Sequence, residues 1–405
     1  MIAAIAIMAC LSVPFGLSMG NSGSFIIKEF SKTILFAYLV LLAVRKSGDL
    51  YRLIWAMTAA GGALAWLSLF VFRMQKQGDT ISRIQNGYSY DSNDLGLVAV
   101  LCLVLSTLTW QVAKSRGKVA SLIVMGGLGA AIARTGSRGA FLTLVVVGGA
   151  VLVLLQGVSA AKKVAFVILT IIAMLLAAPA GYWEQMETIL RPTQDYNWSS
   201  PTGRKEVFLR GMGYMMTNPV TGIGVDNFPR AEGEISARAE AREFDPTLPG
   251  IKWSAAHNSF LQAATEMGIP GFIIFSILVF GAPVQCHRLR KKMVGWDKGD
   301  DEQRFLYFTA LYLPIAFIGF AVGGNFVSFA YLDPLYVLVA FVGGLHISYD
   351  ERMRREARAG DGGGGPQVIA PETAGPRRHR GGLAQGQGRP PAALPPPVMY
   401  PRSSS

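Results

Sequence analysis

A histidine stands directly in front of an apolar stretch of this chain, in the sequence Ala256-His257-Asn258-Ser259-Phe260-Leu261-Gln262. Imidazole takes up and releases a proton near neutral pH, which is the chemistry of a general base or acid. Ser254 is the expected N-cap of the helix that follows, so His257 would lie in its first turns and stay neutral beside the positive helix end. Taken alone, however, His257 is better interpreted as a histidine that only forms hydrogen bonds at an interface.

Arginines are the second group of side chains that could do chemistry. The segment Arg134-Thr135-Gly136-Ser137-Arg138-Gly139 lies between two apolar stretches, and two further candidates, Arg204 and Arg210, lie in the one long polar segment. Guanidinium groups bind phosphate through two parallel hydrogen bonds, whereas an arginine at a membrane edge can simply extend to the lipid headgroups. Because small residues flank Arg138, we favour phosphate binding there. The candidates are Arg134, Arg138, Arg204 and Arg210. Other basic residues on the same side are Arg73, Lys76, Arg83, Arg191 and Lys205.

Acidic and amide residues near these positions are supporting candidates. Alternative bases are Glu206, Asp226 and Glu266, whose simpler role is capping a helix or pairing with Lys and Arg. Asn258 and Gln262 belong to the same motif as the histidine. The segment Asp91-Ser92-Asn93-Asp94 could hold a cation, but capping of the next helix by Asn93 or Asp94 is the simpler interpretation.

Several kinds of site are missing from the sequence. There is no Asp-x-Asp pair on the side of the arginines, no Walker-type loop and no dinucleotide-binding glycine motif. The three cysteines lie in or beside apolar stretches and form no metal or disulfide pattern. We therefore expect neither a metal nor a cofactor, and an ATP-driven or nicotinamide-dependent enzyme is disfavoured.

The composition is that of a polytopic membrane protein. Of 405 residues, 51% are hydrophobic and 16% are charged, against about 25% charged in soluble domains. Several apolar stretches approach the roughly 20 residues that cross a bilayer. The net charge of +12 therefore indicates basic loops at a membrane rather than nucleic-acid binding.

The pattern predicts an all-α fold with about ten transmembrane helices. The expected spans are 2–19, 33–44, 53–72, 95–113, 119–133, 139–156, 164–180, 268–286, 305–323 and 334–348. Loops near 45–52, 114–118, 162–163 and 288–292 are basic and fall on one side, together with the C-terminal segment. The positive-inside rule makes that side cytoplasmic. His257 and the candidate arginines then lie on the outer side.

Four regions follow from this reading. Residues 1–180 hold the N-terminal transmembrane helices, 181–255 a long outer loop, 256–348 the C-terminal transmembrane helices, and 349–405 a disordered cytoplasmic tail. Within the outer loop we expect an amphipathic helix from Thr202 to Met216, a glycine turn, and a solvated helix from Phe228 to Phe244.

Four motifs together resemble the O-antigen ligase / O-antigen polymerase family of bacterial inner-membrane glycosyltransferases, over residues of about 80–325. They are Asn86-Gly87-Tyr88 with Ser92-Asn93-Asp94-Leu95-Gly96-Leu97; Arg134-Thr135-Gly136-Ser137-Arg138-Gly139-Ala140; Arg204-Lys205 with Asn218-Pro219-Val220-Thr221-Gly222-Ile223-Gly224-Val225-Asp226-Asn227-Phe228; and His257-Asn258-Ser259-Phe260-Leu261-Gln262 with Glu266-Met267-Gly268-Ile269-Pro270-Gly271. Family members have up to twelve spans, so this chain departs from the family at its ends.

The resemblance implies a glycan donor carried on undecaprenyl pyrophosphate at the periplasmic leaflet, used without a nucleotide sugar or a metal. The acceptor would be lipid A-core in a ligase, another lipid-linked glycan in a polymerase, and Ser or Thr in a related protein O-oligosaccharyltransferase. By the same resemblance, His257 matches the motif histidine, the proposed base, and Arg138 and Arg204 match the arginines that hold the pyrophosphate. Partners are then the donor, the acceptor and the membrane, with no nucleic acid.

A transporter is the main alternative from another class, since ten spans with both ends inside also fit a permease. Transporters carry repeated halves and charged or broken helices near the middle of the bilayer, and neither is evident here. The polar residues of interest lie in the outer loops, which favours an enzyme acting at the membrane surface. An inactive scaffold for an assembly complex is a third interpretation.

Overall fold

A computed structural model describes residues 1–77, 81–84, 91–154, 158–191, 198, 200, 203–245, 247–248 and 253–361 of the chain. Residues 1–358 form one compact unit, which contains every feature discussed below. The second unit, 359–405, is described only at its first three residues. The tail expected to be disordered therefore lies almost entirely outside the described residues, as does the Asn86-Gly87-Tyr88 motif.

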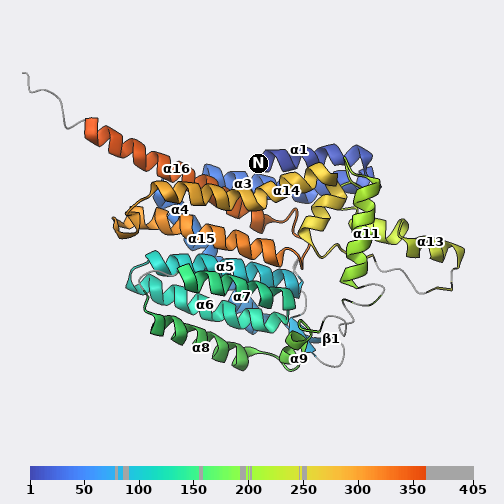
Figure 1. Cartoon of the computed structure of the whole chain (residues 1–405), viewed down its shortest axis with the longest axis horizontal. Helices are drawn as coiled ribbons and strands as arrows, with labels where there is room; N and C mark the ends of the chain where they lie inside the picture. Colours follow the sequence, from blue (N-terminus) through green and yellow to red (C-terminus); the bar gives the residue numbers. More distant parts are fainter. Residues whose placement is uncertain are drawn as a thin grey trace, which may run out of the picture. The chain divides into compact units, whose positions relative to one another are not determined.

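The fold is all-α, as the hydropathy pattern predicts, and the expected spans fall largely on helices (Figure 1). The first expected span, 2–19, is broken, because α1 ends at Ser12 and residues 16–18 are not helical. The main helices are α1 Ile2–Ser12, α2 Met19–Phe25, α3 Ser31–Leu42, α4 Ser47–Trp66, α5 Ser92–Val112, α6 Ser115–Thr135, α7 Arg138–Leu154, α8 Ala160–Ala177, α14 Ser259–Lys292, α15 Asp301–Gly323 and α16 Asp333–Asp361. Among the described residues, five helices are long and apolar enough to cross a membrane, and two apolar helices are shorter.

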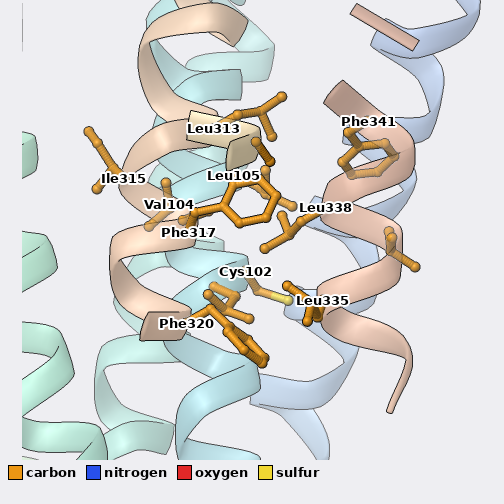
Figure 2. Close-up of a cluster of buried hydrophobic side chains, with 14 of the residues drawn as sticks. Cys102, Val104, Leu105, Leu313, Ile315, Phe317, Phe320, Leu335, Leu338 and Phe341 are labelled. Atoms are coloured by element: carbon orange, nitrogen blue, oxygen red, sulfur yellow. The ribbon is translucent and has the colours of Figure 1, made fainter. Parts of the chain in front are cut away.

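The core forms where α5 and α15 pack against each other and against α16. In Figure 2, Cys102 and Leu105 of α5 meet Phe317 and Phe320 of α15, with residues of α16 closing the other side. These side chains are almost completely buried. Most of each central helix is buried, 72% of its apolar window, which fits the uniformly apolar sequence, because a helix with little surface toward solvent needs no polar stripe.

The basic loops meet at one end of the helix bundle, as their charge pattern predicts. Lys114 at the start of α6 pairs with Asp301 at the start of α15, with Nζ and Oδ2 3.0 Å apart. Arg352 of α16 binds Glu302 at 2.7 Å, and the Ser47 hydroxyl of α4 donates to the same carboxylate. Three of the segments predicted to share a side, 45–52, 114–118 and the start of the C-terminal segment, therefore contact the beginning of α15 through polar and charged side chains.

The opposite end carries the shorter elements of the long outer loop (Figure 1). These are α9 Tyr182–Glu187, α11 Arg204–Thr217, α12 Phe228–Glu234 and α13 Ala237–Phe244. In Figure 1, α11 runs across the bundle direction, and it packs against α14. The amphipathic helix expected from Thr202 to Met216 is thus confirmed within two residues at either end.

Three local predictions were wrong. The single helix expected over 228–244 is two helices, because the Ser236 hydroxyl accepts the Ala239 amide and caps a new helix, α13. Asp91 caps α5, since its carboxylate accepts the amides of Asn93 and Asp94. The tail boundary at 349 is also too early. Helix α16 runs on to Asp361, with i,i+4 ion pairs such as Arg352 to Glu356 along its exposed turns.

One element had no counterpart in the predictions. Strands β1 Met74–Gln77 and β2 Ile81–Ile84 pair antiparallel, with Met74 opposite Ile84 and Gln75 opposite Arg83. The hairpin lies between α4 and α5, at the same end of the bundle as the long outer loop (Figure 1). β2 packs against α6, so the hairpin reaches the turn that contains the candidate arginines.

Candidate functional site

His257 lies just outside the helix in which the sequence placed it. The N-cap of α14 is Asn258, whose side-chain oxygen accepts the amides of Phe260 and Leu261, so the predicted cap at Ser254 is wrong. His257 has a φ of 48°, a left-handed conformation that few residues other than glycine adopt. Its amide donates to the Ser328 hydroxyl at 2.9 Å. The imidazole is therefore carried on a strained, tethered residue and is half-buried.

The partner of this motif is the α15–α16 loop, residues 324–332. The Ser259 amide donates to the Gly324 carbonyl at 2.7 Å, and the Ser259 hydroxyl donates to the Val327 carbonyl at 2.9 Å. The Gln262 side chain accepts the amide of Ala330. Asn258 also reaches the loop, since its Nδ2 donates to Asn325. The amide side chains predicted to support the site thus act by fixing this loop against the start of α14.

In the same loop, Phe326 packs against the residue that follows Arg138 and lies beneath Arg204. Gly139, next to Arg138, packs so closely on this ring that an added Cβ would lie 2.6 Å from the Phe326 Cβ. The Arg204 guanidinium lies over the same ring, 5.9 Å from its centroid. Arg138 itself donates through Nη1 to the Thr188 hydroxyl at 2.7 Å. Residues from α7, α11 and the α15–α16 loop therefore meet at one place.

Arg83 on β2 joins this cluster. Its Nε donates to the Thr135 carbonyl at 3.0 Å and its Nη2 to the Asn93 side chain at 2.9 Å. Burial lowers the pKa of its guanidinium to about 10, Asp91 opposes the shift, and the positive charges of Arg204 and Arg138 lower it further. The sequence showed only that Arg83 precedes a span. Its membership of the cluster depends on the unpredicted hairpin.

The other two predicted arginines have partners inside the protein. Arg210 makes a two-pronged ion pair with the buried Glu232, with Nη2 and Oε2 2.6 Å apart. This pair joins α11 to α12, and Tyr214 donates to the same carboxylate. Arg134 donates through Nη1 to the Leu69 carbonyl. Both arginines therefore have structural contacts, and a role of either one in anion binding stays a prediction.

The glycine turn of the outer loop fits into a break in α14. Pro270 has no amide hydrogen, so the Glu266 carbonyl has no helical partner and accepts the Gly224 amide at 3.1 Å instead. The Thr265 carbonyl similarly accepts the Ile223 amide at 2.9 Å, while the Ile269 amide donates to Pro219. Two motifs far apart in the sequence thus exchange hydrogen bonds.

Glu266 and Asp226 lie beside this junction. Glu266 is fully buried, and its Oε1 accepts the Phe228 amide at 3.1 Å. Asp226 has a φ of 59°, and its carbonyl accepts the Asn21 side chain at 2.8 Å. Burial raises the pKa of the Asp226 carboxyl group, and the bond from Asn21 partly offsets that rise. Both acidic side chains therefore contact backbone or neighbouring residues that hold the junction together.

An apolar groove of about 590 Å³ begins at the polar end of this region. Its polar members include Asn258 and Asn325, the pair that links the histidine motif to the α15–α16 loop. Its walls are formed by aromatic and aliphatic side chains of α11 and α14. The apolar members include Phe208, Met212, Met215, Phe260, Ile269, Phe272 and Phe280. The groove can therefore take an apolar chain that ends near His257.

The chemistry available here is proton transfer beside concentrated positive charge. A neutral imidazole can accept a proton from a hydroxyl group, and the guanidinium groups can bind an anion or stabilise charge on a leaving phosphate. The segment Asp91–Asp94, considered as a cation site, is instead a helix cap. No group of three or more His, Cys, Asp or Glu side chains is placed to hold a metal in the part of the chain that the structure describes.

Residues 120–276 match a protein-family model described as O-antigen ligase. The matched region begins in α6 and ends in α14, so it includes Arg138, Arg204, the glycine turn and His257. It excludes the hairpin with Arg83 and the α15–α16 loop with Phe326. No curated protein is similar to the chain along its sequence.

Proposed function

We propose that the chain acts as an O-antigen ligase, which transfers a glycan from undecaprenyl pyrophosphate to a hydroxyl group of lipid A-core. The match of residues 120–276 to the O-antigen ligase model supports this proposal. The match supports a glycosyltransferase of the O-antigen ligase/polymerase type. The reaction would take place at the periplasmic face of the bacterial inner membrane. The observation that carries the proposal is the meeting of His257, Arg138 and Arg204 around the α15–α16 loop.

Each group has a distinct part in the proposed reaction. His257 takes the proton of the acceptor hydroxyl, and the acceptor oxygen forms a bond to the anomeric carbon of the glycan. The bond from that carbon to the pyrophosphate breaks, and the pyrophosphate leaves with the electron pair. Arg138 and Arg204 stabilise the negative charge that grows on it, an effect that is often the largest single contribution to catalysis. Attack opposite the leaving group inverts the anomeric configuration, and no step in this scheme uses a metal.

The apolar groove supports a lipid-linked substrate. An undecaprenyl chain is a long hydrocarbon, and the groove walls offer Phe208, Phe272 and Phe280 to it. Several of these side chains are otherwise exposed, as expected for residues that face lipid. The polar end at Asn258 and Asn325 would then hold the pyrophosphate end of the chain close to His257.

Three other functions remain as alternatives. A polymerase would use a second lipid-linked glycan as acceptor, and a protein O-oligosaccharyltransferase would use a Ser or Thr hydroxyl group. Both would use the same donor and the same His257 chemistry. A transporter would need its polar residues along a path through the bundle. The described candidates instead gather at one end, which favours the enzyme.

The test is a transfer assay with the purified full-length protein in detergent and EDTA. Undecaprenyl-pyrophosphate glycan is supplied alone or with lipid A-core, and the products are separated on a gel. Transfer to lipid A-core is the expected result. A ladder of longer glycans from donor alone would identify a polymerase. If neither product forms and a Ser- or Thr-containing acceptor protein also stays unmodified, the proposed transferase activity is wrong.

A further inference from the structure

We propose that Arg83, carried on the β1–β2 hairpin, is the third cation of the anion-binding site formed by Arg138 and Arg204. The inference rests on the proposed function for the identity of the anion, a lipid-linked pyrophosphate. It concerns a residue outside the segment that matches the family. In this proposal the hairpin positions a positive charge that comes from outside the matched segment.

The geometry places Arg83 directly beside the turn that precedes Arg138. Its Nε binds the Thr135 carbonyl at 3.0 Å, three residues before Arg138 in the sequence. Its Nη2 binds Asn93 at the start of α5 at 2.9 Å. The guanidinium group is thus fixed between the ends of α5 and α6, on the side of the bundle where α7 begins.

Guanidinium groups that gather at one place favour the binding of an anion. Arg138 and Arg204 lie close enough to Arg83 that their charges help to lower the pKa of its guanidinium. That pKa is about 10, so Arg83 remains charged at neutral pH. Asp91 is the acidic residue that opposes this shift. Like charges in a partly buried site repel one another strongly, because water screens them poorly there. A pyrophosphate, with several negative charges, would be attracted by all three groups, and the same poor screening would strengthen that attraction.

Arg83 is also attached to the backbone of the site, so its charge and its hydrogen bonds must be tested separately. Arg83→Lys keeps the positive charge and loses the planar group that binds Thr135 and Asn93 together. Arg83→Gln removes the charge and keeps a hydrogen-bond donor. Arg73→Gln is the matched control, because it removes the same charge from an exposed position just before β1.

The experiment measures binding of labelled undecaprenyl pyrophosphate to the full-length protein in detergent, with uncharged undecaprenol as the companion probe. We expect Arg83→Gln to weaken pyrophosphate binding by about tenfold or more, Arg83→Lys to weaken it less, and Arg73→Gln to change it by less than about twofold. Undecaprenol binding should not change. Added salt should weaken pyrophosphate binding more in the wild-type protein than in Arg83→Gln, because fewer charges remain to be screened.

Two results would overturn the inference. One is Arg83→Gln binding undecaprenyl pyrophosphate as tightly as the wild-type protein. The other is an equal loss in Arg83→Gln and Arg83→Lys with the wild-type salt dependence retained, which would show that Arg83 only supports the turn. Failure of the proposed function looks different. In that case the wild-type protein itself would bind undecaprenyl pyrophosphate no better than undecaprenol.

Discussion

His257 is held in a backbone conformation that non-glycine residues rarely adopt, with a φ of 48°. Such strain costs on the order of 1–3 kcal/mol and persists only where surrounding contacts fix it. Here the Ser328 hydroxyl binds the His257 amide, and the Asn258 cap follows immediately. A histidine serving only as an interface residue would need no such constraint. The conformation therefore adds support to a functional role for the imidazole.

Substitution of His257 separates its chemistry from its structural contact. The contact to Ser328 uses the backbone amide, so His257→Ala should fold and insert normally. We expect this variant to lose about 10²- to 10⁴-fold in transfer rate, the usual contribution of a general base, while undecaprenyl-pyrophosphate binding changes little. The rate is measured by the transfer assay and folding by detergent size-exclusion chromatography. Retention of full activity would remove His257 from the mechanism.

Glu266 is the alternative base that the structure makes easiest to test. It is fully buried, and its Oε1 accepts the Phe228 amide. Glu266→Gln keeps this acceptor and should retain most of the activity. Glu266→Ala leaves a buried amide without its partner, and should cost about 1–3 kcal/mol of stability, seen as a lower thermal unfolding temperature. A folded but inactive Glu266→Gln protein would instead make Glu266 the base.

At the scale of the elements, the break in α14 is where the glycine turn of the outer loop packs against the helix that follows His257. Gly268 has a φ of 69° and a ψ of −171°, a combination that is essentially confined to glycine. An added Cβ there would lie 2.7 Å from the Pro219 carbonyl oxygen. At Gly222, in the turn that packs against it, an added Cβ would lie 2.4 Å from Glu266 backbone. The glycines of both motifs are therefore required by the close approach of two backbones.

Substitution of these glycines should destabilise the protein more than substitution of an ordinary helical glycine. Gly268→Ala combines a disfavoured conformation with a clash, so we expect a loss of at least about 2 kcal/mol. Gly126→Ala is the control, because nothing lies near its Cβ position in α6, and its effect should stay within about 1 kcal/mol. Thermal unfolding in detergent measures both. Equal stability of the two variants would mean that the junction tolerates a side chain.

Elements that are determined by a few neighbouring residues could be predicted from the sequence, and elements that depend on distant contacts could not. Apolar stretches and caps act over a few residues, so the helices and the amphipathic α11 could be predicted from the sequence. Asp91 replaced the expected cap of α5 and Asn258 that of α14, because several polar residues compete at each helix start. The hairpin carrying Arg83 could not be predicted, since its short strands contain polar residues and lack a clear alternation.

The candidate site was predictable only as a set of residue types. Motif resemblance singled out His257, Arg138 and Arg204, but nothing in their spacing shows that the α15–α16 loop contacts His257, Arg204 and the neighbour of Arg138. Contacts between residues separated by more than a hundred positions leave no periodic signal in a single sequence. The same limit explains why Arg210, which is paired with Glu232, was selected together with the clustered arginines.

At the scale of the whole molecule, the two ends of the helix bundle carry different sets of charged side chains. One end holds the paired basic and acidic residues Lys114, Asp301, Glu302 and Arg352, and the other holds His257 and its arginines. Basic loops remain on the cytoplasmic side during membrane insertion. If the end with Lys114 and Arg352 is the cytoplasmic one, as this rule predicts, lipid-linked substrates displayed on the outer side meet the site without crossing the bilayer.

Cysteine labelling can decide this orientation. Glu240 of α13 and Val294 between α14 and α15 are exposed at opposite ends of the bundle. The natural Cys102 and Cys286 are buried, so Cys10→Ser gives a suitable background. In intact spheroplasts a membrane-impermeant maleimide should label Glu240→Cys at once, and Val294→Cys only after lysis. The reverse pattern would place the arginines and His257 in the cytoplasm. A glycan displayed in the periplasm could not reach them there, so a donor on the cytoplasmic side would have to replace the proposed one.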